Sequence, residues 1–137
     1  MRDAWNITSP SPDAQHTARF VYGGEIRFGP LYFSLSVDAY SFGERIFGDT
    51  HLWSSSNLLA VQEWLTIDYS EGPITALLLI DVRLRRAVSL ARATKRFLVP
   101  ESFADSIIVY RQENAGHGIV EHFDADITKV AEWNAFA

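Results

Sequence analysis

The sequence predicts a mainly β fold: an antiparallel meander of seven to nine short strands that forms a sandwich or an open barrel. Apolar and polar residues alternate at period two over several segments, and turn-forming residues separate these segments about every ten positions. The 137 residues, 47% of them hydrophobic, suffice for one packed core. Prolines and small polar residues gather near the N-terminus, so we expect a loose arm over residues 1–18 and a single β domain over residues 19–137.

The first two predicted strands form a hairpin. Apolar residues of one parity run through residues 20–28, where the pair Gly23-Gly24 predicts a bulge or bend. In residues 31–39 the odd positions are apolar and most even positions are polar, which is the pattern of a half-buried strand. The pair Gly29-Pro30 lies between the two segments and predicts a tight connection.

The middle of the chain predicts three further strands. Residues 46–53 form an apolar segment that ends at a serine-rich turn over residues 54–57. Residues 58–67 are more continuously apolar, which is typical of a central strand covered on both faces. A polar turn over residues 68–73 follows, and residues 74–84 then alternate almost without exception, the clearest strand pattern in the chain.

The next segments predict shorter strands. The pair Arg85-Arg86 either continues the preceding strand or turns the chain back into residues 87–90. Residues 97–99 form a short strand that Pro100 ends, because proline cannot donate to a strand ladder.

The C-terminal part predicts one more hairpin and an ambiguous tail. Residues 107–110 and 119–123 are its arms, joined by a glycine- and asparagine-containing loop over residues 112–118. Residues 127–136 keep helical spacing behind Asp126 as an N-cap, so we expect a short C-terminal helix; an edge strand is the alternative.

Charge and composition exclude several classes of protein. The net charge of −5, from 17 acidic and 12 basic residues, argues against a main role in nucleic-acid binding. The basic stretch 83–96 is interpreted as a solvated strand face paired with nearby acids. The absence of cysteine excludes disulfides, cysteine nucleophiles and thiolate metal sites. No apolar run approaches the roughly 20 residues of a membrane helix and no secretory signal is present, so we expect a cytoplasmic protein that binds no membrane.

The sequence contains no catalytic signature. Nucleophile-elbow, zinc-protease, P-loop and dinucleotide-binding motifs are absent. His117 and His122 flank a predicted loop and could meet Asp124 or Asp126 as metal ligands, and the two aspartates could form an acid–base pair. We interpret these residues instead as a solvated or partner-facing edge, and we predict no catalytic residue, no metal and no cofactor.

Two acidic segments are the candidates for partner contact. Tyr69 lies in a predicted turn between Asp68 and Glu71, and a tyrosine buries a large area at low cost in side-chain entropy. The second segment lies on the last predicted strand of the hairpin. The predicted partner-binding residues are Asp68, Tyr69, Glu71, Glu121, Asp124 and Asp126.

One segment resembles a β-propeller blade. Residues 51–61 and 77–82, within the span 50–90, combine an aromatic-serine turn, an apolar strand and a strand that ends in Ile-Asp. A propeller needs at least four blades of about 40 residues, which 137 residues cannot supply. We therefore expect at most a blade-like meander closed by other strands.

As a whole, a small, acidic, cysteine-free, aromatic-rich β domain is similar in type to many immunity proteins of bacterial polymorphic toxin and type VI secretion systems. The resemblance implies a non-catalytic protein that binds a cognate toxin domain in the cytoplasm, one to one, and occludes its active site. Toxins that attack nucleic acids tend to have electropositive sites, so acidic loops would speed association and exclude substrate. The alternative is a small-ligand-binding or accessory β domain whose aromatic residues line a cavity.

Overall fold

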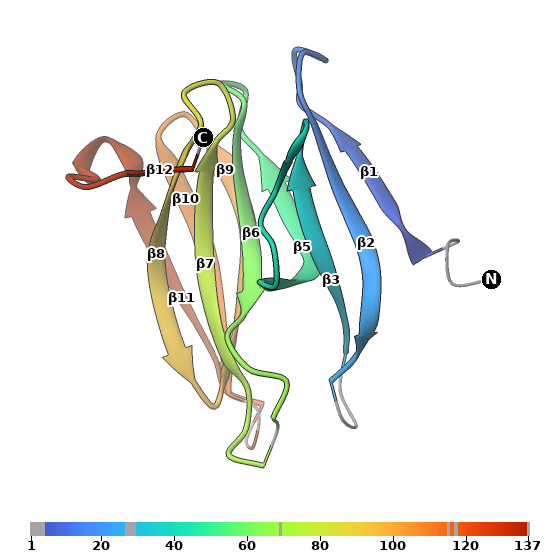
Figure 1. The fold of residues 1–137 in the computed structure, drawn as a ribbon. Helices are drawn as coiled ribbons and strands as arrows, with labels where there is room; N and C mark the ends of the chain where they lie inside the picture. Colours follow the sequence, from blue (N-terminus) through green and yellow to red (C-terminus); the bar gives the residue numbers. More distant parts are fainter. Residues whose placement is uncertain (1–4, 27–29, 69, 115, 117, 137) are drawn as a thin grey trace.

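The computed structural model describes residues 5–26, 30–68, 70–114, 116 and 118–136, which contain twelve strands in two antiparallel sheets (Figure 1). The mainly β, antiparallel architecture is thus confirmed. Nine strands have seven residues or more: β2 (Thr17–Glu25), β3 (Leu31–Val37), β5 (Ile46–Trp53), β6 (Leu58–Trp64), β7 (Ile74–Asp81), β8 (Arg86–Thr94), β9 (Arg96–Ala104), β10 (Ile107–Asn114) and β11 (Val120–Asp126). Three are shorter: β1 (Ile7–Pro10), β4 (Tyr40–Ser41) and β12 (Asn134–Ala135).

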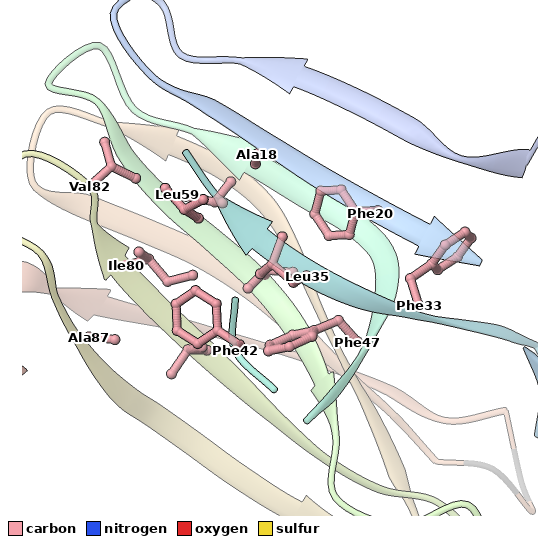
Figure 2. Close-up of a cluster of buried hydrophobic side chains, with 13 residues drawn as sticks. Ala18, Phe20, Phe33, Leu35, Phe42, Phe47, Leu59, Ile80, Val82 and Ala87 are labelled. Atoms are coloured by element: carbon pink, nitrogen blue, oxygen red, sulfur yellow. The ribbon is translucent and has the colours of Figure 1, made fainter. Parts of the chain in front are cut away.

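The large sheet bends sharply between β3 and β5. Its strand order is β1-β2-β3-β5-β6-β7-β8-β12, with β4 paired to β3. A single residue pair, Phe33 with Phe47, joins β3 to β5, so the two halves can diverge. The half formed by β1–β3 folds over β5–β7, and the space between is filled by the first core cluster (Figure 2). Fully buried members of this cluster include Phe20 and Leu35 on one side and Leu59 and Ile80 on the other.

The small sheet, in the order β11-β10-β9, covers the opposite face of β5–β8. Leu98 of β9 and Ile108 of β10 pack there against Leu77 and Leu79 of β7 in a second core cluster. Consecutive residues of β7 therefore face different clusters, since Leu78 belongs to the first. The sequence predicted such a doubly covered strand over residues 58–67, and β6 is one, with six of its seven residues buried.

Several predicted elements are confirmed in detail. The register of β2 on β3 shifts between Tyr22 and Gly24, which is the predicted glycine bulge. The turn after β5 is closed by Ser54, whose side chain accepts hydrogen bonds from the N–H groups of Ser56 and Leu58. Residues 27–29, in the connection between β2 and β3, lie outside the described residues. They include Phe28, predicted as the last residue of the first strand segment, and Gly29 of the predicted tight connection.

Three predictions about elements are wrong. Instead of a loose arm, β1 pairs with β2, and the intervening turn is held by hydrogen bonds of Ser11 and Asp13. The strand expected over residues 74–84 ends at Asp81, whose carboxylate accepts the N–H of Leu84 in a turn, and Arg86 begins the return strand. Pro100 does not end β9. It lies at a bulge on the edge of the small sheet, where a missing N–H is tolerated.

The C-terminal helix is also largely wrong. Asp126 does cap a turn, by accepting the N–H of Thr128, but the turn is a 3-10 helix of three residues, Ile127–Lys129. The chain then forms β12 on the edge of β8, which is the alternative that the sequence left open. Trp133 and Phe136 explain the choice, because they pack against the second and the first cluster respectively.

Candidate functional site

The two predicted acidic residues of the β6–β7 loop lie on the surface. Asp68 and Glu71 are exposed, and Tyr69 lies outside the described residues. The carboxylate of Asp68 accepts the N–H of Ser70 at 3.0 Å, and hydrogen bonds from the backbone and side chain of Ser70 lower the pKa of Asp68. Asp68 is therefore a fixed negative charge at the tip of this loop.

The three predicted acids of β11 do not form one group. Glu121 has the opposite parity to the other two, and pairs with Arg96 at 3.3 Å. Asp126 is committed to capping, since it accepts hydrogen bonds from both the N–H and the hydroxyl of Thr128. Asp124 is exposed on the outer face of the small sheet, where its charge adds to the effect of burial in raising the pKa of Tyr110. Of the three, Glu121 lies nearest to the β10–β11 loop.

The β6–β7 and β10–β11 loops lie at the same end of the molecule, which we call the loop end (Figure 1). A chain of hydrogen bonds joins strands that flank these loops. The hydroxyl of Thr75 donates to the carbonyl of Arg96 at 2.7 Å, and the guanidinium of Arg96 donates to Gln112 at 3.0 Å and contacts Glu121. The two sheets are thus fastened together at this end.

The loop end exposes large apolar side chains. Ile67 is 57% and Ile119 59% exposed. Leu65 in the β6–β7 loop and Val120 at the start of β11 are exposed beside them. A hollow of about 520 Å³ opens beside Leu65 and Ile67, with Tyr32, Ile46 and Trp64 in its lining. Exposed apolar residues beside a hollow, with acids nearby, are typical of a protein-binding surface.

One partly buried ion pair lines this hollow. The guanidinium of Arg45 donates from Nε and Nη2 to the two carboxylate oxygens of Glu63, each at 2.7 Å. The Glu63 side chain is 6% exposed and that of Arg45 is 45% exposed. The hydrogen bonds to Glu63 raise the pKa of Arg45 above its usual value. The Arg45 guanidinium also lies over the rings of Phe42 and Phe47.

The sequence interpretation missed this pair, although a signal was present. Glu63 lies in the segment that predicted a strand covered on both faces, and a carboxylate buried there requires a partner. The identity of the partner depends on the pairing of β5 with β6, which brings Phe47 opposite Glu63 and so Arg45 within reach.

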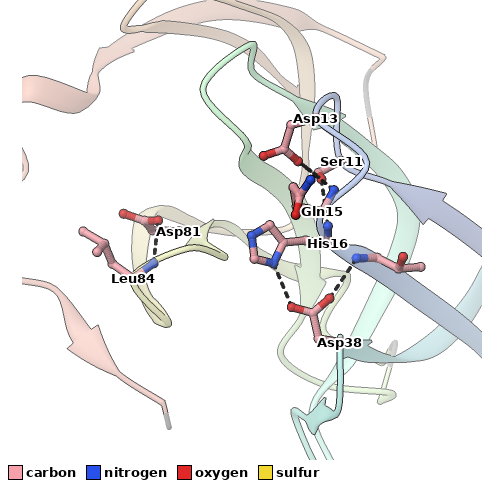
Figure 3. Close-up of polar contacts among 8 residues, drawn as sticks. Ser11, Asp13, Gln15, His16, Asp38, Asp81 and Leu84 are labelled. Atoms are coloured by element: carbon pink, nitrogen blue, oxygen red, sulfur yellow. Dashed lines mark hydrogen bonds and ion pairs between the residues drawn. The ribbon is translucent and has the colours of Figure 1, made fainter.

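Two polar networks lie elsewhere in the first half of the fold. His16 and Asp38 are joined at 2.8 Å and link the β1–β2 turn to the β3–β4 turn (Figure 3). Burial favours a higher pKa of Asp38, but hydrogen bonds from His16 and the N–H of Thr17, with the charges of His16 and Arg85, hold it below its usual value.

The second network joins Ser9, His51 and Trp53. Nδ1 of His51 lies 2.8 Å from the carbonyl of Asp49, so in the neutral ring this nitrogen donates and Nε2 accepts from the Ser9 hydroxyl at 2.9 Å. The indole N–H of Trp53 donates to the same hydroxyl. The hydroxyl is engaged from both sides, so this network ties β1 to β5.

The residues considered for metal ligation do not come together as expected in the part of the chain that the structure describes. His117 lies outside the described residues, and His122 pairs with Glu101 at 3.0 Å rather than with an aspartate. Within the described residues no group of three or more histidine, aspartate or glutamate side chains has the arrangement of a metal site. The six basic residues of 82–96 are likewise dispersed: Arg86 pairs with Asp81 at one end of β8, and Arg96 lies beyond the other end.

Comparison with known proteins found no matching family model, no matching curated protein and no matching solved structure. The described part of the chain contains no helix of the length and apolar character that crossing a bilayer requires.

Proposed function

We propose that this protein is a non-catalytic binding protein that docks its loop end on a partner protein. One observation carries the proposal: Leu65, Ile67, Ile119 and Val120 are exposed at the end of the molecule where the 520 Å³ hollow opens. Such a hollow can take an apolar anchor from the partner, which is how most binding energy is concentrated in protein interfaces.

The acids of the loop end suggest the chemistry of the partner. Asp68 and Glu71 lie in the same loop as Ile67, and Glu121 follows Val120. Negative charge around an apolar centre favours a partner with a basic site and accelerates encounter with it. Together with the resemblance in type, this supports an immunity protein of a bacterial polymorphic toxin or type VI secretion system, which would block the basic active site of a toxin in the cytoplasm.

The test is co-expression of the protein with the product of the adjacent reading frame, followed by measurement of the affinity of the complex. We expect rescue of growth and a 1:1 complex that buries about 1,200–2,000 Å². Ile67→Glu should weaken binding at least tenfold, because it places a charge at the apolar centre. The double variant Asp68→Lys, Glu71→Lys should mainly slow association.

Matched controls come from the opposite end of the molecule and from the tail. Leu84 is 53% exposed in the β7–β8 turn, so Leu84→Glu is the control for Ile67→Glu. Glu132→Lys, at an exposed position before β12, is the control for the charge reversals. Equal loss of affinity in Leu84→Glu and Ile67→Glu, or failure of the wild type to bind that product, contradicts the proposal.

A further inference from the structure

A second hollow, of about 330 Å³, lies where β7, β8 and β12 meet the β3–β5 connection. It shares Arg45 with the first hollow and has otherwise a different lining. Leu78 of β7 and Ala87 and Ser89 of β8 contribute to its lining from the large sheet. Asn134 of β12 and Arg45 contribute polar groups. Its volume is at the small end of the range for pockets that bind small molecules.

Three aromatic rings form one wall of this hollow. Tyr40 and Phe42 contact each other edge to face with ring centroids 5.1 Å apart. The Phe136 ring packs against both, with its centroid 4.6 Å from that of Tyr40 and 5.1 Å from that of Phe42. Phe136 belongs to the C-terminal tail, whereas the other two precede β5, so the wall exists only when the tail is docked on β8. A wall of rings favours a planar, unsaturated ligand, whose face or edge can pack on them.

Arg45 lines this hollow as well as the first, and one of its donor groups is unused. Nε and one N–H of Nη2 are taken by Glu63, whereas Nη1 has no hydrogen-bond partner in the described part of the chain. The guanidinium is held over the Phe42 ring at 5.8 Å, so its orientation is fixed before any ligand arrives. Fixed N–H donors at the end of an aromatic wall select a ligand with a hydrogen-bond acceptor at its edge.

The charge of the site determines whether the acceptor on the ligand is anionic or neutral. The charge of Arg45 is balanced by Glu63, whose buried carboxylate would repel a second anion. A neutral carbonyl accepts from Nη1 without that repulsion. We propose that this hollow binds a small, neutral aromatic molecule that carries a carbonyl or amide group, with the ring against Tyr40, Phe42 and Phe136 and the carbonyl oxygen on Arg45.

Titration of the full chain with benzamide, followed by amide NMR shifts, tests this site. We expect saturable shifts at Ala87, Ser89, Asn134 and Phe136, with a Kd on the order of 1 mM. Benzoate should bind at least fivefold more weakly because of Glu63, and cyclohexanecarboxamide should bind more weakly because it lacks a π face. Tighter binding of benzoate, or equal binding of the saturated amide, overturns the ligand class.

Variants at exposed positions of β8 test the location without disturbing the ion pair. Ser89→Phe fills the hollow from its lining and should weaken benzamide binding at least tenfold. Thr94→Leu is the matched control, because Thr94 is exposed on the same strand and outside the lining. Ile67→Glu should leave benzamide binding unchanged, so failure here is distinct from failure of the loop end. No saturable shift at the named amides, or equal binding by Ser89→Phe and wild type, refutes the site.

Discussion

The side chain of Glu63 is 6% exposed, and its ion-pair partner is Arg45. Breaking such a pair from one side leaves an uncompensated buried charge, which costs more than the pair itself contributes. We expect Arg45→Ala to lower the free energy of unfolding by about 2–4 kcal/mol, and the double variant Arg45→Ala, Glu63→Gln to lower it less. Urea denaturation of both variants at neutral pH measures this. A double variant less stable than Arg45→Ala would contradict the account.

Asp38 gives a pH dependence whose sign follows from its lowered pKa. A carboxyl group with a lower pKa in the folded state stabilises the fold above its unfolded pKa, and this contribution is lost as pH falls through the folded value. The free energy of unfolding should therefore decrease from about pH 4 downward. Asp38→Asn should reduce that slope, since asparagine tolerates the backbone φ of 54° and can still accept the N–H of Thr17. An unchanged slope in the denaturation profile of this variant would refute the role of Asp38.

The role of a residue can be predicted from the sequence when its partners are close to it along the chain. The turn that carries Asp68 and Glu71 is predictable, because a Gly-Pro pair ends this segment and polar residues fill it, and both acids are exposed there. The capping role of Asp126 was likewise local. The pairing of Glu63 with Arg45 was not predictable, because it joins side chains 18 positions apart through a strand register that tertiary packing determines.

Among the elements, β5 leaves no room for a side chain at Gly48. A Cβ atom there would clash with Oε1 of Gln62, whose amide N–H donates to the carbonyl of Leu98 at 2.9 Å. We expect Gly48→Ala to destabilise the fold by about 1–3 kcal/mol through overpacking. In the background Gln62→Ala the same change should cost clearly less, because the obstructing amide is gone. A double-mutant cycle by chemical denaturation measures the coupling, and additive effects would show that the close approach is relieved in another way.

Element-level prediction failed where a neighbouring strand decided the outcome. The long strands follow from period-two alternation, which burial on a sheet face imposes. The sequence predicts a strand end at Pro100, because the local sequence does not show that this proline lies on an edge strand beside a bulge. The apolar spacing of the tail predicts a helix. In the structure Trp133 and Phe136 instead pack against different clusters on opposite sides of the large sheet.

At the scale of the whole molecule, the sequence predicted a sandwich or an open barrel, and the structure has three layers that share one central sheet. The outer layers, β1–β3 and β9–β11, cover opposite faces of β5–β8. The order of the layers could not be predicted, since a strand such as β7 is apolar on both faces and does not indicate which segment covers which.

We expect the two clusters to unfold together, because they share the central sheet. Leu98 of β9 is fully buried in the second cluster, where it packs with Leu79 of β7. The opposite face of β7 belongs to the first cluster. We expect Leu98→Ala to lower the free energy of unfolding by about 2–5 kcal/mol, the usual cost of a cavity. Native-state hydrogen exchange should report the same decrease at the amides of Leu35 in β3 and Ile108 in β10, because their opening requires loss of the same central strands. A decrease confined to the amides of β9–β11 would show instead that the small sheet detaches on its own and that the two clusters are independent.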